Sequence, residues 1–122
     1  MRAGRPAEAA RSADAAVEMA RRHRERGHEA WAIRLLGEAA LHKDPMGAAH
    51  AELHLRHALA LAAELGMRPL IGHCHLALGQ LDAYAGSAVS AEEHLGMATT
   101  MYRDMDMGFW LARAEAALKD AG

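Results

Sequence analysis

The chain of 122 residues contains 30 alanines and 15 leucines and has a formal net charge of −2 at pH 7. Only two valines, two isoleucines, two threonines and five aromatic residues are present, and because strands are built mainly from such residues, a β-rich fold is excluded. No stretch of about 18 apolar residues occurs without a charged residue or histidine, which excludes a membrane-spanning helix.

Helix-breaking and helix-capping residues divide the chain into six segments of helical length. We expect helices at 6–26, 29–42, 46–65, 68–85, 88–105 and 108–120. Gly27 and Gly66 are predicted to end helices, and Asp44, followed by Pro45, is predicted to begin one. Because the connections are short, successive helices are expected to form antiparallel pairs in an all-α fold.

A pattern of small and large residues recurs about 40 residues apart along the chain. Small residues let two helices approach closely, and a leucine between them fills the adjoining hole. The first copy consists of Leu36, Gly37, Ala51, Leu55 and Ala58, and the second consists of Leu78, Gly79, Gly86, Ala91, Leu95 and Ala98. Two helices per period of this length indicate a helical-hairpin solenoid.

This pattern resembles the tetratricopeptide repeat (TPR), in which a Leu-Gly pair in one helix packs against Ala, a large apolar residue and Ala in the next. The first copy departs from the family, because an insertion near the turn replaces the usual glycine by Asp44-Pro45. The position that commonly carries an aromatic residue is Ala40 in one copy and Asp82 in the other. The resemblance implies one TPR-like domain over 1–122, with a flanking helix at 1–27, repeats at 28–66 and 67–106, and a capping helix at 107–122.

Three longer segments, 27–41, 58–81 and 93–118, resemble the C-terminal repeat region of bacterial signalling proteins that carry an ATPase and a class III nucleotide cyclase. The chain has no phosphate-binding loop of the form G-x-x-x-x-G-K-[ST], so the resemblance implies a regulatory or scaffold part with no enzymatic activity and no cofactor. The single cysteine, Cys74, excludes an internal disulfide and is typical of a reducing cytoplasm.

In repeats of this kind, the first helix of each pair lines a concave groove. In each first helix, the Leu-Gly pair packs against the second helix. Residues that point away from this contact are therefore expected to bind an extended peptide or a partner helix. The predicted groove residues are Trp31, Arg34, Glu38, His42, His73, Leu76, Gln80, Tyr84 and Arg113. We expect a non-catalytic protein–protein interaction module, with a protein or peptide as its partner and no membrane contact.

Two alternative functions start from other residues. His50, His54 and His57 share one face of a helix and are candidate zinc or nickel ligands of a His-rich metal-binding protein. An arginine-rich segment at 21–26 offers a weaker alternative, a small nucleic-acid-binding regulator. Aromatic residues that could stack on bases are missing from that segment, so we interpret it as a solvated helix end and the histidines as surface or groove residues.

Two further apolar clusters are assigned from their helical spacing. Val17 and Met19 would favour a homodimer if the first helix lacks a neighbouring repeat. Met97, Met101 and Met105 repeat every four residues and are predicted to form core where the fifth helix meets the sixth. Phe109 and Trp110 are predicted to pack in the same place.

Overall fold

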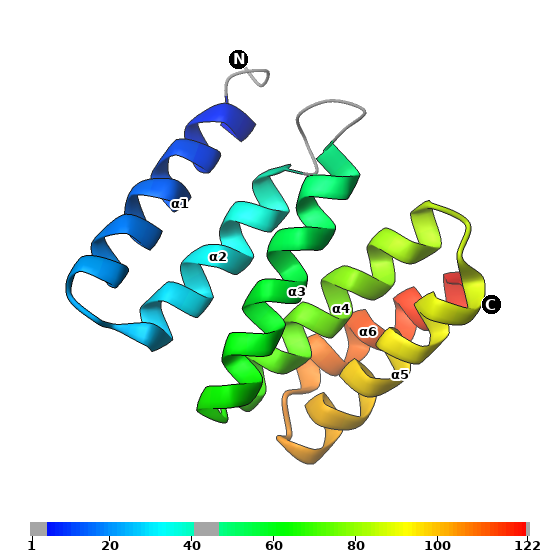
Figure 1. Cartoon of the computed structure of the whole chain (residues 1–122). Coiled ribbons are helices and arrows are strands. Elements are labelled where there is room, and N and C mark those ends of the chain that lie inside the picture. The colour runs from blue at the N-terminus through cyan, green and yellow to red at the C-terminus, as the bar shows by residue number, and fades with distance from the viewer. Residues whose placement is uncertain (1–4, 41–46, 122) are drawn as a thin grey trace. The chain divides into compact units, whose positions relative to one another are not determined.

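The computed structural model describes residues 5–40 and 47–121, with side chains from residue 8 onward. These residues form six helices and no strand (Figure 1). The helices are α1 (Arg5–Arg22), α2 (Arg26–Ala40), α3 (Gly47–Leu65), α4 (Arg68–Tyr84), α5 (Ala88–Asp104) and α6 (Gly108–Ala121). The predicted all-α fold is confirmed, whereas His42 and the predicted helix start at Asp44-Pro45 lie outside the described residues.

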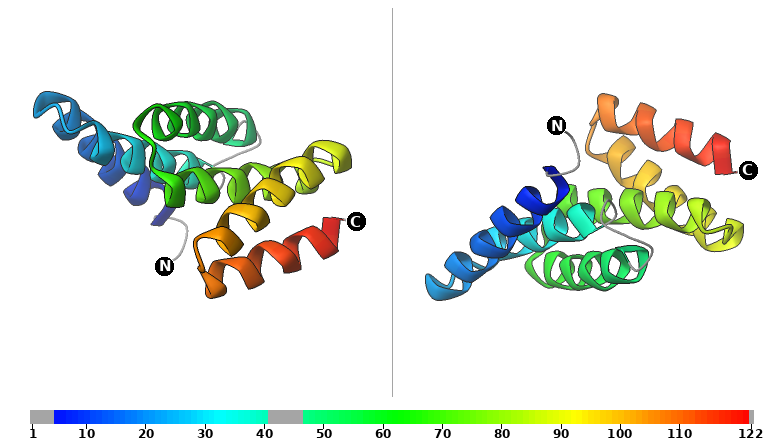
Figure 2. Two further views of the ribbon diagram at one scale, coloured as in Figure 1. Left: turned by 90° about the horizontal axis from the view of Figure 1, so that it is seen from below. Right: turned by 90° about the horizontal axis from the view of Figure 1, so that it is seen from above.

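The chain divides into two compact units, residues 1–66 and 67–122. In the first unit α2 packs against both α1 and α3, and in the second α5 packs against both α4 and α6. Successive helices within each unit run antiparallel (Figure 2). The division falls where the sequence places the boundary between its two repeats. None of the described helices combines the length and apolar character that crossing a membrane requires.

Four of the turns between helices contain a residue with positive φ: Arg24, Gly66, Gly86 and Asp106. At Arg24, Gly86 and Asp106 the following amide bonds to a carbonyl five residues earlier, as Ser87 N does to Asp82 O at 2.8 Å. This is the Schellman arrangement that ends many helices.

The prediction that Gly27 ends the first helix is wrong, because Arg24 takes the left-handed position and Gly27 lies inside the first turn of α2. A non-glycine residue in this conformation costs about 1–2 kcal/mol. The turn is held by the bond from Glu25 N to Ala20 O at 2.8 Å. Val17 is only 5% exposed, so of the two residues assigned to a dimer contact, only Met19 is exposed.

The small residues of the sequence pattern lie at close helix contacts in each unit. A Cβ on Gly37 would stand 3.1 Å from Leu55 Cγ, and a Cβ on Gly79 would stand 2.6 Å from Leu95 Cγ. Leu78 is fully buried, Leu36 is half-buried, and Gly86 lies in an exposed turn. The four pattern alanines, each with no exposed surface, are Ala51, Ala58, Ala91 and Ala98.

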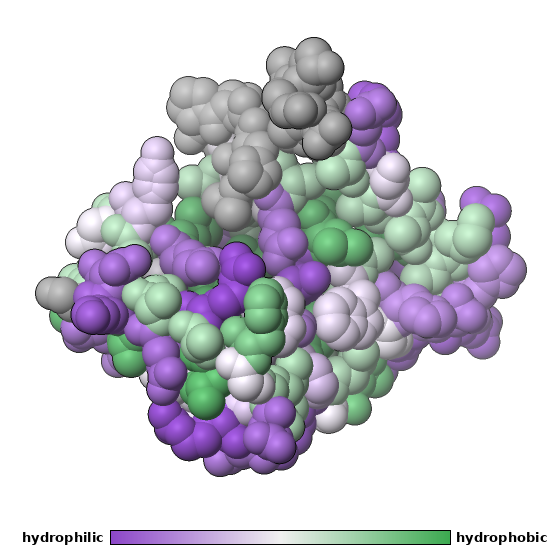
Figure 3. Space-filling view, turned by 180° about the vertical axis from the view of Figure 1, so that it is seen from behind, coloured by the Kyte–Doolittle hydropathy of each residue, from purple (hydrophilic) through white to green (hydrophobic). Residues whose placement is uncertain are grey.

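The core of the second unit surrounds Tyr102, which is completely buried. Met105 and Trp110 pack against this core, as predicted. Met97 and Phe109 do not, since 54% and 65% of their surfaces are exposed. The assignment of Met97 to the core is wrong because four residues turn a helix by about 400°, so a stripe with that spacing drifts around the helix. Polar and apolar residues are interspersed on the face shown in Figure 3.

Two glycines of the second unit provide a matched test of the helix contact. Gly79→Ala should lower the free energy of unfolding by about 1–2 kcal/mol, because the added methyl overlaps Leu95 and overpacking has costs of this size. Gly96→Ala should raise it by up to about 1 kcal/mol, because Gly96 has nothing within 4 Å of the added carbon and alanine is the better helix former. Urea unfolding measures both values. A stabilising Gly79→Ala substitution would show that the helices do not depend on this contact.

Candidate functional site

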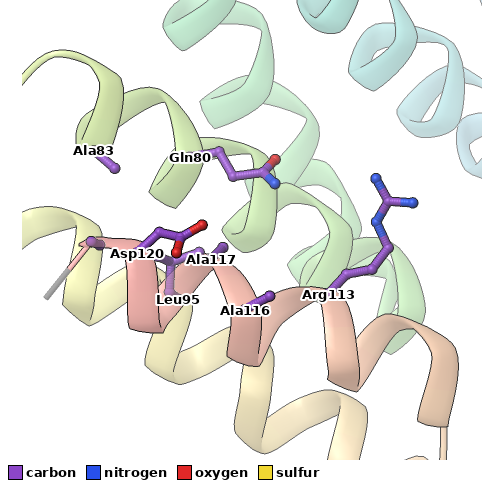
Figure 4. A pocket seen from close by; sticks show the side chains of 8 residues that line it. Gln80, Ala83, Leu95, Arg113, Ala116, Ala117 and Asp120 are labelled. Carbon is purple, nitrogen blue, oxygen red and sulfur yellow. The ribbon is translucent and has the colours of Figure 1, made fainter.

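A surface groove in the second unit lies between α4 and α6, with Leu95 of α5 at its floor (Figure 4). It has a volume of about 380 Å³. The groove is lined by Gln80, Ala83, Leu95, Arg113, Ala116, Ala117, Asp120 and Ala121. Four of these eight residues are alanine, and their short side chains leave the space between the two helices unfilled.

Three polar side chains stand at the rim of this groove. In the view of Figure 4, Gln80 extends from α4 between Asp120 and Arg113, which both belong to α6. Within the described ranges, neither Arg113 nor Asp120 takes part in an ion pair. The rim therefore presents a cation, an amide and a carboxylate above an apolar floor.

Two aromatic rings orient the guanidinium of Arg113. Its Cζ lies 5.5 Å from the centre of the Phe109 ring and 5.6 Å from the centre of the Trp110 ring. Cation–π attraction at such distances holds the group in place without neutralising its charge. The charge of Arg113 thus remains available for an anionic group in the groove.

A buried hydrogen bond anchors this aromatic group to α4 and α5. His73 Nδ1 and the hydroxyl of Tyr102 form a hydrogen bond of 2.6 Å, and the His73 ring meets Trp110 edge-on with centres 4.6 Å apart. His73 is 7% exposed and Leu76 is 5% exposed. Both were predicted to line a groove, but the structure places them in the interior, because His73 packs against Tyr102 and Trp110 and Leu76 belongs to the core around Leu95 and Tyr102.

The other predicted groove residues of the second unit lie at the surface. Gln80 and Arg113 line the groove described above, whereas Tyr84 is 85% exposed at the end of α4. The sequence missed Ala116 and Asp120, which face Gln80 from α6. Ala116 and Asp120 follow Arg113 by three and seven residues, and this spacing could have placed all three on one face of the helix.

In the first unit, α2 carries three predicted groove residues as a connected cluster. Arg34 Nη1 donates a hydrogen bond to Glu38 Oε2 at 2.7 Å, and its guanidinium carbon lies 5.2 Å from the centre of the Trp31 ring. Arg34 Nε is buried and has no hydrogen-bond partner among the described residues. These contacts fix the cluster within its own helix, and its binding role stays a prediction.

The candidate metal ligands lie on α3. His50 and His57 are exposed, and His54 stands beside Gly37, where an added Cβ would lie 3.1 Å from His54 Cβ. In the parts of the chain with described side chains, no group of three or more His, Cys, Asp or Glu residues is arranged to hold a metal ion. Cys74 is completely buried.

The basic segment near the α1–α2 turn is engaged in ion pairs. Arg21 Nε lies 2.8 Å from Glu29 Oε2, and Arg26 Nη2 lies 2.6 Å from Glu64 Oε2. Part of the positive charge that suggested nucleic acid as a partner is therefore balanced within the first unit.

A polar network that the sequence did not reveal joins α4 to α5. His75 Nδ1 and His94 Nδ1 form a hydrogen bond of 3.0 Å, and His94 Nε2 lies 3.9 Å from Asp82 Oδ2. Ser90 Oγ donates to the same carboxylate oxygen at 2.5 Å. These contacts join His75 and Asp82 of α4 to Ser90 and His94 of α5, so the network links the two helices.

We expect the second unit to lose stability in acid, because of His75. Burial, and secondly the neighbouring His94, lower the pKa of His75 below its ordinary value. A group with a lowered pKa in the folded state binds fewer protons there than in the unfolded chain, so its stabilising contribution is complete above about pH 6.5 and is lost as the pH falls below that value. Thermal unfolding measured at about pH 7.5 and about pH 5.5 should show this loss. His75→Gln should weaken the dependence, whereas an unchanged slope would contradict the assignment.

Comparisons of the chain with models of protein families, with curated proteins and with solved structures give no match. The site is therefore defined by the residues of this chain alone. The groove between α4 and α6 combines an apolar floor with Arg113 and Asp120, for which the described residues offer no ion-pair partner, and it is the candidate site for contact with another molecule.

Proposed function

We propose that the protein is a non-catalytic interaction module that binds a segment of a protein partner in the groove between α4 and α6. The observation that carries the proposal is the composition of the groove. Its floor consists of alanine and leucine side chains, and its polar residues are Gln80, Arg113 and Asp120. Apolar grooves with a few oriented polar groups are the surfaces on which helices and peptides dock.

A frame of side-chain contacts adjoins the groove. Trp110 is fixed by His73, which is itself bonded to Tyr102, and the frame positions Arg113 through its cation–π contact with Trp110. A partner would therefore meet side chains that are already oriented, which reduces the ordering required on binding. This favours recognition of a partner over a purely structural role for the exposed residues.

The proposal includes a TPR-like arrangement of the helices and a place in bacterial cytoplasmic signalling. The repeated Gly-Leu contact in both units supports the first part. The second part is supported by the longer segments that resemble the repeat region of signalling proteins. The predicted residues Trp31, Arg34 and Glu38 would contribute a second contact surface on α2.

Blocking the groove tests the proposed function. Peptides are first selected on the immobilised protein from a display library of random sequences. Ala116→Trp should weaken their binding at least about tenfold, because the indole fills the space that the partner needs. Ala112→Trp is the matched control, since Ala112 is an exposed alanine on α6 that does not line the groove. Fluorescence anisotropy measures the affinities, and circular dichroism verifies that both variants fold. Equal binding by both variants would refute the proposed site.

A further inference from the structure

The charges at the rim of the groove have a fixed order along α6. Arg113 and Asp120 are seven residues apart, which is about two helical turns or about 10 Å along the axis. Both line the groove, so both are presented to the same partner. The groove therefore carries a positive group toward one end and a negative group toward the other.

These two charges differ from others on the same unit that are already neutralised. Arg103 Nη2 lies 3.4 Å from Glu115 Oε2, and Arg68 Nη2 lies 3.9 Å from Asp104 Oδ2. In contrast, the described residues offer no ion-pair partner for Arg113 or Asp120. A binding segment with an acidic and a basic group could form an ion pair with each of these two side chains.

The floor between the two charges suits one large apolar side chain. Ala116 and Ala117 are the α6 residues between Arg113 and Asp120 that line the groove, and Leu95 lies below them. Small residues at such a position let another helix come close, so that a leucine-sized side chain can enter the space between α4 and α6.

A helix is the segment whose geometry matches this order. Residues seven positions apart lie on one face of a helix, with the third and fourth positions between them on the same face. A helix lying along the groove would place an acidic group near Arg113 and a basic group near Asp120. Its apolar residue would then lie over the floor of the groove.

We infer that the partner is an amphipathic helix with one acidic and one basic residue seven positions apart and a large apolar residue at the third or fourth position between them. This inference rests on the proposed function and specifies the partner's chemistry. Gln80, between the two charges in the view of Figure 4, would contact polar groups of the partner beside its apolar residue.

Synthetic helical peptides of about four turns test the charge order. Each contains a central leucine, and the positions flanking it at a separation of seven carry Glu and Lys, two Lys, or two Glu. The protein should bind the Glu/Lys peptide about threefold or more tightly than either like-charged peptide, because each exposed ion pair contributes modestly. Arg113→Glu should transfer the preference to the peptide with two lysines.

Two controls separate charge order from other effects. Arg103→Glu makes the same change in net charge outside the groove and should leave the preference of the protein unchanged. A Glu/Lys peptide whose helix is interrupted by proline should bind more weakly. Equal binding of the interrupted peptide would overturn the helical partner.

The outcomes distinguish this inference from the proposed function. Equal affinities for the three peptides, all abolished by Ala116→Trp, would overturn the charge order but leave the groove as the binding site. Failure of all three, while library-selected peptides bind and are sensitive to Ala116→Trp, would overturn the partner chemistry alone. Binding that Ala116→Trp does not affect would overturn both.

Discussion

The missing side chains at Gly37 and Gly79 are the constraint on which both helical hairpins depend. An added Cβ would crowd a leucine of the neighbouring helix at both positions, at 3.1 Å from Leu55 Cγ for Gly37 and at 2.6 Å from Leu95 Cγ for Gly79. The small side chains of Ala51, Ala58 and Ala91 have no exposed surface, as is typical of positions where two helices pack closely. The high alanine content is thus a consequence of helix spacing as well as of helix propensity.

The groove follows from the same spacing in the second unit. Because α5 lies close to α4 at Gly79, Leu95 reaches the floor between α4 and α6. The interior contact of His73 with Tyr102 and Trp110 then fixes the beginning of α6. Toward its end α6 presents alanines to α4, whose short side chains do not fill the space between the two helices, and a surface groove remains. The beginning of α6 is therefore packed against α4, whereas its end borders the groove.

The sequence predicted the helices well, because glycine and proline positions and the spacing of small residues are local signals. It failed at Gly27, because Arg24 adopts a left-handed conformation that arginine rarely takes. It predicted Gln80 and Arg113 at the groove, but placed His73 there although its ring is buried. The pairing of His75 with His94 depends on the register between two helices. One sequence without tertiary contacts does not reveal such a register.

The turns at Gly66, Gly86 and Asp106 share a positive φ and follow one another at intervals of 20 residues. The two helices between them, α4 and α5, each contain 17 residues. One residue inserted in α5 ahead of Leu95 would rotate the preceding and following parts of the helix by about 100° relative to each other, so Leu95 could no longer face Gly79 while the turn at Gly86 kept its place. Helix length in this chain is therefore under tighter constraint than the identity of its exposed residues, and length changes would be tolerated mainly in the connections.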